Sequence, residues 1–385
     1  VAVGVMAGFC QGGGVGKCIA EWIIDGEPSI DVWAMDVARF GDYASPQYGT
    51  IKSSENYERR FIMTFPNETL PKGRKQKTTA LYDRFVNQGA VMGDSFGLEN
   101  VLWFANNKED AHEEPTIKRS RSHDYVSKEV INVRENVGLI EVANFSKHEF
   151  KGPDARKFLD HIMAGRLPKP GRISLSPMLS YRGKLCGDLT VACLDENEFM
   201  VFGSGAAQEM HRRWFESHLD KFNLNYKNRS DEFHGLSIAG PNSRKVLEKI
   251  VRDDVSNEKF KFRDSRRMFV GGVPALVNRI SFTGELGYEI YVAPHYQLKL
   301  YEELVEAGKE FNIKPFGGRA LMSMRLEKNW GAWTLDYRPD FTAKETGLDV
   351  FINWDKEFIG KESAQKENSS NKLIPLIVDR KSTRR

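Results

Sequence analysis

The sequence predicts an α+β chain that contains more than one domain. Three observations support this: the length of 385 residues, the alternation of strand-like and helix-like stretches, and an almost wholly polar segment at 106–121. A chain of this length normally forms two or three domains. Hydrophobic residues make up 40% of the chain and include 24 Phe and 7 Trp, which is enough apolar material for several packed cores.

Charge and cysteine content argue against several function classes. Lys and Arg number 56 against 53 Asp and Glu, which is too close a balance for a nucleic-acid footprint. No run reaches 18 apolar residues, so we expect neither a membrane-spanning helix nor a membrane partner. The cysteines form no CxxC pair and are predicted to be reduced, as in an intracellular protein. They are Cys10, Cys18, Cys186 and Cys193.

Both ends of the sequence are predicted to be interrupted domains. Residues 1–8 are small and apolar, as in a buried strand that closes a domain begun further upstream. Residues 372–378 are predicted to begin a strand, and a basic stretch follows. We therefore expect a fragment, although a natural carboxyl-terminal strand with a basic tail would give the second pattern as well.

The stretch 8–24 is predicted to form a Gly-rich turn followed by an amphipathic helix, which Gly26-Glu-Pro28 ends. Its GGGVGK segment departs from both the phosphate-loop and the GxGxxG patterns, because Cys18 follows the lysine and the third glycine is missing. A turn without side chains before a helix can still bring backbone N–H groups to an electron-rich ligand. The pattern leaves a ligand site and a plain tight turn as alternatives.

After the polar segment, which we interpret as a linker, strand and helix patterns alternate. Strands are expected at 137–142, 185–193, 199–202, 276–282 and 288–292, and helices from the Asp154 cap to Gly165, from about 206 to 222, at 246–251 and at 298–311. The two strands around Thr283-Gly-Glu-Leu-Gly287 are predicted to form a hairpin.

Two acidic residues lie in these apolar strands. A buried carboxylate without a partner is costly, so Asp188 is either part of a salt bridge or a functional acid with a shifted pKa. Alternation along 288–292 places Glu289 and Tyr291 on one face of the strand. An acid beside an aromatic side chain suits a planar ligand that donates hydrogen bonds, and it also suits a solvent-facing surface, which is the commoner case.

Residues 8–40 resemble the closing segment of the flavin-binding domain in the dimethylglycine and sarcosine dehydrogenase family. The similarity lies in the GF start, the Gly-rich turn, the AEWI helix, the GEPSID turn and the DVARF exit. It implies that Gly13, Gly14 and Gly16 bind FAD near its pyrimidine ring. It also implies that the nucleotide half of this FAD site lies upstream, so that the site is incomplete in this chain.

From about residue 122 the chain resembles the aminomethyltransferase fold of the glycine-cleavage T protein. The most specific motifs are SFTGELGYEIYV at 281–292 and TGLDVFINWDKEFIGKESA at 346–364, with MLSYRGKLCGDLTV at 178–191. The resemblance implies tetrahydrofolate as a cofactor, with Asp188 as the catalytic group beside its reactive nitrogens and Glu289 bound to the pterin edge. One carboxylate can accept the adjacent N–H donors of that edge together.

The resemblance also indicates weaker folate contacts. Tyr291 shares the face of Glu289, and Phe282 stands where the family usually has Tyr, so that a hydroxyl contact is lost. Arg325 is expected to bind the glutamate tail of folate or to pair with Glu327. Glu141 lies near the place of a family acid but with shifted spacing, and no role is assigned to it.

These resemblances imply a domain order. Residues 1–42 would end an FAD-dependent oxidoreductase domain, 43–115 would form a connecting domain, 116–370 would form the aminomethyltransferase-like folate-binding region, and 371–385 would begin a further barrel. The implied function is the flavin- and tetrahydrofolate-dependent oxidative demethylation of an N-methylated glycine derivative, of the dimethylglycine or sarcosine type, with transfer of the one-carbon unit to folate.

An electron-transfer flavoprotein or oxygen would accept the electrons. The location would be the cytoplasm, or the mitochondrial matrix in a eukaryote. Two alternatives stay open: a stand-alone folate-dependent aminomethyl- or methyltransferase, and a folate-binding module without chemistry.

Overall fold

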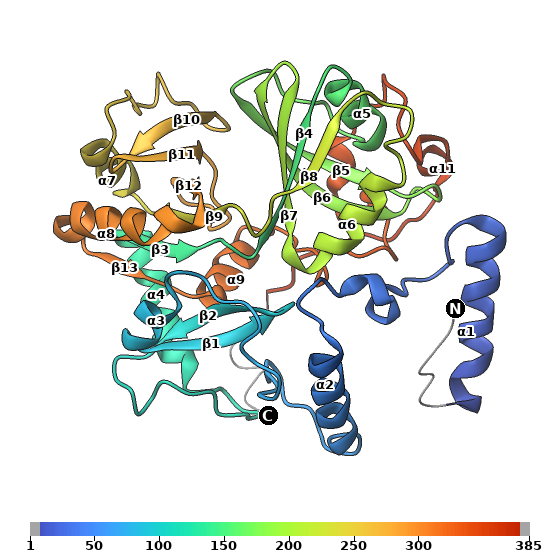
Figure 1. The fold of residues 1–385 in the computed structure, drawn as a ribbon, viewed down its shortest axis with the longest axis horizontal. Coiled ribbons are helices and arrows are strands. Elements are labelled where there is room, and N and C mark those ends of the chain that lie inside the picture. Colours follow the sequence, from blue (N-terminus) through green and yellow to red (C-terminus); the bar gives the residue numbers. More distant parts are fainter. Residues whose placement is uncertain (1–7, 378–385) are drawn as a thin grey trace.

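Two β-sheets organise the second half of the chain in the computed structural model, which describes residues 8–377 (Figure 1). The six-stranded sheet has the order β10-β11-β12-β9-β3-β13 and the five-stranded sheet the order β5-β6-β7-β4-β8. The strands of the first are β3 Val137–Glu141, β9 His234–Ala239, β10 Ser265–Val270, β11 Val273–Asn278, β12 Gly287–Val292 and β13 Ile313–Pro315. Those of the second are β4 Phe145–Lys151, β5 Arg172–Leu179, β6 Leu185–Asp195, β7 Glu198–Ser204 and β8 Asn225–Asn228.

Helices cover one face of each sheet. On the five-stranded sheet, Leu189 and Val191 of β6 pack with Phe158 of α5 and Phe215 of α6. On the six-stranded sheet, Ile290 of β12 belongs to the core that includes residues of α7 and α8. The helices of this half are α4 Ser122–Glu135, α5 Ala155–Ile162, α6 Gln208–Glu216, α7 Ser243–Ile250, α8 Gln297–Gly308, α9 Gly318–Glu327, α10 Ala343–Thr346 and α11 Lys361–Lys366.

The opposite faces of the two sheets meet in a buried group that we call the interlayer cluster. Its central contact is the stacking of Phe202 of β7 on Tyr291 of β12, with ring centroids 4.7 Å apart. The members are Val130, Val133, Ile140, Val142, Ile173, Ala192, Met200, Phe202, Ala239, Leu276, Tyr291, Phe316, Ala320 and Met324. The cluster joins the two sheets, because its side chains come from strands of both.

The N-terminal part is smaller and mostly helical. Its elements are α1 Phe9–Asp25, α2 Pro46–Glu58, α3 Tyr82–Asn87, β1 Ala90–Ser95 and β2 Leu98–Phe104, and short 3-10 turns lie at Trp33–Met35 and Val37–Arg39. β1 and β2 form an antiparallel pair that contacts α3, α4 and α9. Further 3-10 turns are Gly205–Ala207, Pro294–Tyr296, Lys309–Phe311 and Leu348–Phe351.

The predicted Gly-rich turn is wrong. α1 begins at Phe9, so Gly13, Gly14 and Gly16 lie inside a helix, although Gly26 ends it in the left-handed conformation as expected. No proline interrupts the stretch, and a helical glycine costs only about 1 kcal/mol relative to alanine, so the helix extends through it. The predicted strand at 1–8 lies almost entirely outside the described residues.

Most other predicted elements are confirmed, including the hairpin of β11 and β12 and the irregular polar segment at 106–121. The helix after Asp154 ends at Ile162 rather than at Gly165, whose N–H binds the Ser176 hydroxyl at 2.8 Å. α6 ends at Glu216, well before residue 222. Residues 372–377 form no strand in the structure, contrary to the prediction.

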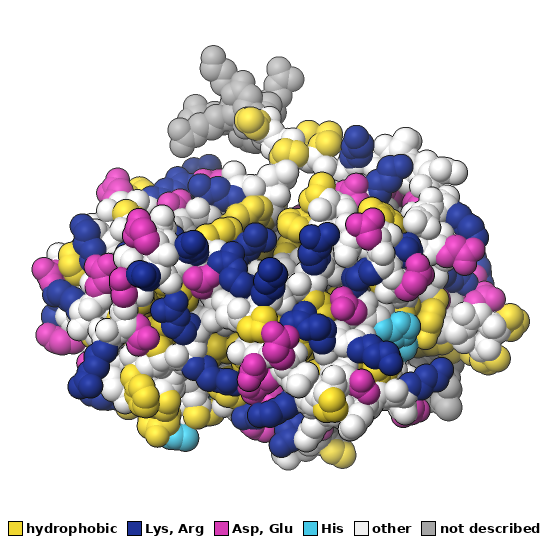
Figure 2. Space-filling view, turned by 90° about the horizontal axis from the view of Figure 1, so that it is seen from above, with side chains coloured by type: hydrophobic (Ala, Val, Ile, Leu, Met, Phe, Trp, Pro, Cys, Tyr) yellow, Lys and Arg dark blue, Asp and Glu magenta, His cyan; other side chains and the backbone are white. Residues whose placement is uncertain are grey.

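The surface shown in Figure 2 mixes both signs of charge, with apolar side chains between them. This agrees with the near balance of acidic and basic residues in the sequence. Among residues 8–377, no helix is both long and apolar enough to cross a membrane.

The interlayer stack generates a stability prediction. Phe202 is 5% exposed, and we expect Phe202→Ala to lower the free energy of unfolding by about 3–5 kcal/mol, because it leaves a cavity between the sheets. Urea denaturation measures this. The matched control is Phe269→Ala on β10, where the side chain is 65% exposed and the change should stay within about 0.5 kcal/mol. Equal losses for the two variants would contradict the role of the stack.

Candidate functional site

Asp188 lies on β6, on the face that turns toward the interlayer cluster. Side chains alternate along a strand, so Asp188 and Thr190 share the face of Ala192, which is a member of that cluster. Burial raises the pKa of Asp188 to about 7, and its own backbone N–H lowers it only in part. The carboxyl group can therefore both hold and release a proton near neutral pH.

Glu289 lies on β12 and is 6% exposed. The Tyr291 hydroxyl donates a hydrogen bond of 2.9 Å to its Oε2 atom, which confirms that the two side chains share one face. Burial raises the pKa of Glu289 to about 7, while this hydrogen bond and the charge of Lys147 lower it in part. The second carboxylate oxygen can accept hydrogen bonds from a ligand.

One row of side chains links the faces that carry the two acids. Phe202 pairs across the sheet with Thr190 of β6 on one side and with Lys147 of β4 on the other. The ring of Phe202 stacks on Tyr291, the hydrogen-bond partner of Glu289. Asp188 and Glu289 thus face the same layer of the protein.

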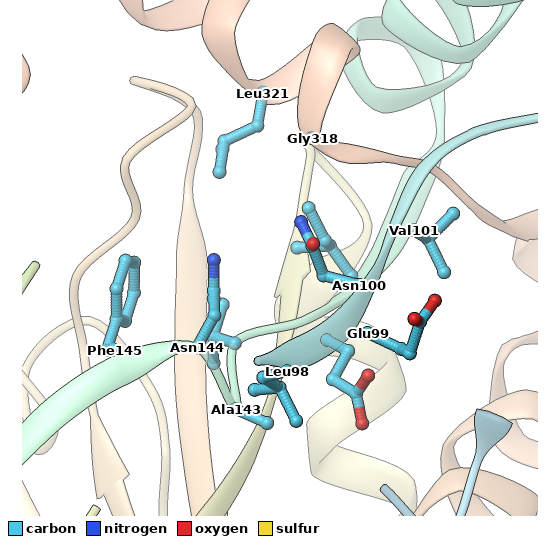
Figure 3. A pocket seen from close by; sticks show the side chains of 12 residues that line it. Leu98, Glu99, Asn100, Val101, Ala143, Asn144, Phe145, Gly318 and Leu321 are labelled. Carbon is cyan, nitrogen blue, oxygen red and sulfur yellow. The ribbon is translucent and has the colours of Figure 1, made fainter. Parts of the chain in front are cut away.

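A small cavity of about 50 Å³ lies beside this layer (Figure 3). Neither Asp188 nor Glu289 lines it or the second cavity, which lies next to α5. A hollow shared by the two acids therefore stays a prediction. Strand alternation directs Asp188 toward the layer, and the hydrogen bond to Tyr291 places Glu289 there. The lining residues are Leu98, Glu99, Asn100, Val101, Ile140, Glu141, Val142, Ala143, Asn144, Phe145, Gly318 and Leu321.

Glu141, to which the sequence assigned no role, lines this cavity. The side chain of Gln297 donates a hydrogen bond to Glu141, and burial raises the pKa of Glu141 to about 7. The Oδ1 atom of Asn100 is buried at the same cavity and has no hydrogen-bond partner among residues 8–377. The cavity can thus present both a titratable acid and a free acceptor.

Lys147 is the second residue that the sequence reasoning missed. It is fully buried, and its Nζ atom donates to the carbonyl oxygens of Ala143 at 2.7 Å and of Ser230 at 3.4 Å. Burial lowers its pKa to about 7, although Asp231, Glu141 and Glu289 oppose the shift. The sequence did contain a sign of this: alternation of side chains along Ser146-Lys-His148 could have indicated that the charged Lys147 lies on the inward face of its strand.

Arg325 is buried, and its guanidinium group already has partners within the protein. Its guanidinium donates to the backbone oxygen of Trp330 at 2.8 Å and forms an ion pair with Asp336. The expected pairing with Glu327 is wrong, because Glu327 pairs with Arg134 instead. A contact from Arg325 to the folate tail stays a prediction, and the observed geometry favours a structural role.

The remaining predicted contacts are that of Phe282 with folate and those of three glycines with FAD. Phe282 lies in the turn before β12, with its ring centroid 6.2 Å from that of Trp330, and both side chains are partly exposed. Gly13, Gly14 and Gly16 have no heavy atom within 4 Å of the position where a Cβ would lie. Nothing in the described residues therefore requires glycine there, and their contact with FAD stays a prediction.

The chain belongs to the GCVT N-terminal domain family, whose model matches residues 81–356. A model described as the FAD dependent oxidoreductase central domain matches residues 25–79. These matches confirm the expected order of an oxidoreductase segment followed by an aminomethyltransferase-type region, whereas the expected boundaries at 42, 115 and 370 stay predictions.

Curated relatives and a solved structure agree with this assignment. The chain is 35% identical to the mitochondrial dimethylglycine dehydrogenase of Homo sapiens, over 95% of this chain and 43% of the relative. It is 28% identical to the mitochondrial sarcosine dehydrogenase of Mus musculus, over 97% of this chain and 46% of the relative. The chain thus spans less than half the length of these relatives. The glycine cleavage system aminomethyltransferase T of Bartonella henselae shares the fold, with a TM-score of 0.64 over 75% of this chain and 74% of that chain at 22% identity.

The raised pKa of Asp188 predicts a pH-dependent effect of Asp188→Asn. Between about pH 4 and pH 7 the folded chain holds a proton at Asp188 that the unfolded chain has lost, so the stability of the unchanged protein falls as pH rises through this window. Asn cannot titrate. Relative to the unchanged protein, Asp188→Asn should therefore gain at least about 1 kcal/mol in unfolding free energy between pH 5 and pH 8.

Denaturant titrations at several pH values measure this difference. Asp195→Asn, at the exposed far end of the same strand, serves as the control and should show no such trend. A constant difference between Asp188→Asn and the unchanged protein from pH 5 to pH 8 would contradict the environment described for Asp188.

Proposed function

We propose that this chain is the folate-handling part of a flavin- and tetrahydrofolate-dependent N-methyl amine dehydrogenase of the dimethylglycine or sarcosine type. The observation that carries the proposal is the placement of the partly buried Asp188 and the buried Glu289, acids from different sheets, on strand faces directed toward one layer. Membership of the GCVT N-terminal domain family and the preceding oxidoreductase segment support it.

The residues of this layer fit a reduced pterin. Glu289 has one oxygen bound to Tyr291, so its other oxygen is available to the adjacent N–H donors of a pterin edge. Bound tetrahydrofolate would supply a nucleophilic nitrogen that captures the one-carbon unit. Glu289 would orient the ring, and burial would keep water away from the reacting atoms.

Asp188 would take up and return the proton at the reacting nitrogen. A group with a pKa of about 7 is suited to general acid–base work near neutral pH. When ionised, the same carboxylate would stabilise positive charge that develops on the one-carbon unit or on the nitrogen, because this interaction is strong in a buried site. Asp188 is thus the proposed catalytic residue.

The three glycines that the resemblance assigns to FAD lie within α1, and their contact with FAD stays a prediction. We therefore assign no step of this chain to FAD. In this proposal the amine is oxidised elsewhere in the whole enzyme, with oxygen or an electron-transfer flavoprotein as electron acceptor. In a eukaryote the enzyme would act in the mitochondrial matrix, since the similar dehydrogenases are named as mitochondrial.

A stand-alone aminomethyltransferase is the second candidate, favoured by the match over residues 81–356. The oxidoreductase match over residues 25–79 argues against it, because a stand-alone transferase needs no such segment. The whole enzyme would reduce its flavin when N-methylated glycine is added, whereas a stand-alone transferase would not.

The proposal predicts different effects for the two acids in the whole enzyme. Asp188→Asn should lower the yield of folate-bound one-carbon product per amine oxidised by at least about tenfold, while tetrahydrofolate binding changes less than about threefold. Glu289→Gln should weaken tetrahydrofolate binding by about tenfold or more, because it replaces one acceptor oxygen with a donor.

Isothermal titration and product analysis measure both effects, with Asp195→Asn as the control. Unchanged coupling in Asp188→Asn would remove the catalytic role of that residue. Normal coupling combined with normal binding in both variants would contradict the proposed site and would mean that folate binds and reacts elsewhere.

A further inference from the structure

The strand that carries Asp188 is paired on one side only at that residue and has a bulge next to it. The ladder with β7 runs from Asp195 to Thr190 and ends there. On the other side of β6, the pairing with β5 continues from Pro177–Asp188 through Met178–Gly187 to Leu179–Leu185, but Pro177 has no N–H to donate and the register shift leaves Cys186 in a bulge without a paired residue. The carbonyl oxygen of Cys186 therefore needs a partner outside the ladder.

His211 of α6 supplies that partner. Its Nε2 atom lies 2.9 Å from the carbonyl oxygen of Cys186, and its side chain is buried, with 1% of the residue exposed. A carbonyl oxygen can only accept, so Nε2 carries the proton and the Nδ1 atom is left as an acceptor. Burial lowers the pKa of His211 to about 4, which keeps this neutral form at physiological pH.

Two glycines make room for this imidazole. A Cβ at Gly187 of β6 would lie 2.9 Å from Nε2, and a Cβ at Gly203 of β7 would lie 3.3 Å from Nδ1. The ring therefore lies against both strands at the place where their ladder ends, and a side chain at Gly187 would force it to shift. Gly187 directly precedes Asp188, so the hydrogen bond to Cys186 acts two residues away from the proposed catalytic acid.

We propose that His211 is a positioning residue: it holds the Cys186–Asp188 segment in place and so directs the Asp188 carboxyl group toward the interlayer cluster. Helix α6 and Asp188 lie on opposite faces of the five-stranded sheet, so His211 acts through the backbone and does not touch a ligand in the interlayer. The catalytic consequence rests on the proposed function, whereas the effect on the strand does not.

Two substitutions separate the hydrogen bond from packing. His211→Leu keeps an apolar side chain of similar size but removes the donor, and His211→Gln retains an N–H group at about the reach of Nε2. Phe215→Leu, one turn later on the same helix and in the same core, is the matched control for a general loss of packing.

The first measurement is hydrogen–deuterium exchange of peptides that cover 185–195 in the full chain, without folate. We expect His211→Leu to raise the exchange rate of the amides at 186–189 by tenfold or more relative to that at 190–195, with His211→Gln close to the unchanged protein. Phe215→Leu should not selectively raise the exchange rate of the amides at 186–189. No selective change in His211→Leu, or an equal change in the control, would overturn the proposal.

The second measurement is the folate-coupled yield in the whole enzyme. His211→Leu should lower the yield at saturating tetrahydrofolate by about tenfold, with KM for tetrahydrofolate within threefold, and His211→Gln should restore most of it. If the unchanged enzyme binds no tetrahydrofolate, the proposed function fails while the exchange result still decides the role of His211. Normal yield in His211→Leu would overturn the positioning of Asp188.

Discussion

The stack of Phe202 on Tyr291 is the contact on which the candidate site depends, because it sets the spacing between the two sheets. Aromatic pairs of this kind add about 0.5–1.5 kcal/mol beyond the area that they bury. Its larger effect is geometric: it brings the Tyr291–Glu289 pair of one sheet to the face of the other sheet that carries Asp188 and Lys147. A shift of one sheet would separate these groups.

The ionisable groups of this layer reduce stability, and this cost suggests a function for them. Asp188, Glu141 and Glu289 all have pKa values raised to about 7 by burial, and Lys147 has one lowered to about 7 by the same cause. Apolar residues would pack there at lower cost. Clusters of strongly shifted pKa values mark sites where protons are held or moved. The sequence thus places ionisable residues in a layer where apolar residues would be more stable, and these are the residues that the proposed chemistry uses.

Local patterns in the sequence predicted a large part of this arrangement. Alternation along β12 placed Glu289 beside Tyr291, and the apolar run of β6 revealed Asp188 as an unusual acid. Both predictions depend only on neighbours along one strand. Resemblance to a family, rather than local pattern, supplied the pterin and the roles of the two acids.

The missed features depend on contacts between distant segments. Lys147 becomes part of the site only through the pairing of β4 with β7, and Glu141 through the approach of β2 and α9 to the end of β3. Arg325 pairs with Asp336 across a turn instead of with its neighbour Glu327. The helix through the N-terminal glycines was missed because glycine signals a turn locally, while a continuous helix tolerates several of them.

The most direct test of the central claim is a crystal structure of the chain with tetrahydrofolate bound. The account predicts that the pterin ring lies in the layer between the two sheets, with its N–H edge on Glu289 and its reactive nitrogens within hydrogen-bonding distance of Asp188. A pterin bound elsewhere, or one that contacts only one of these two acids, would contradict it.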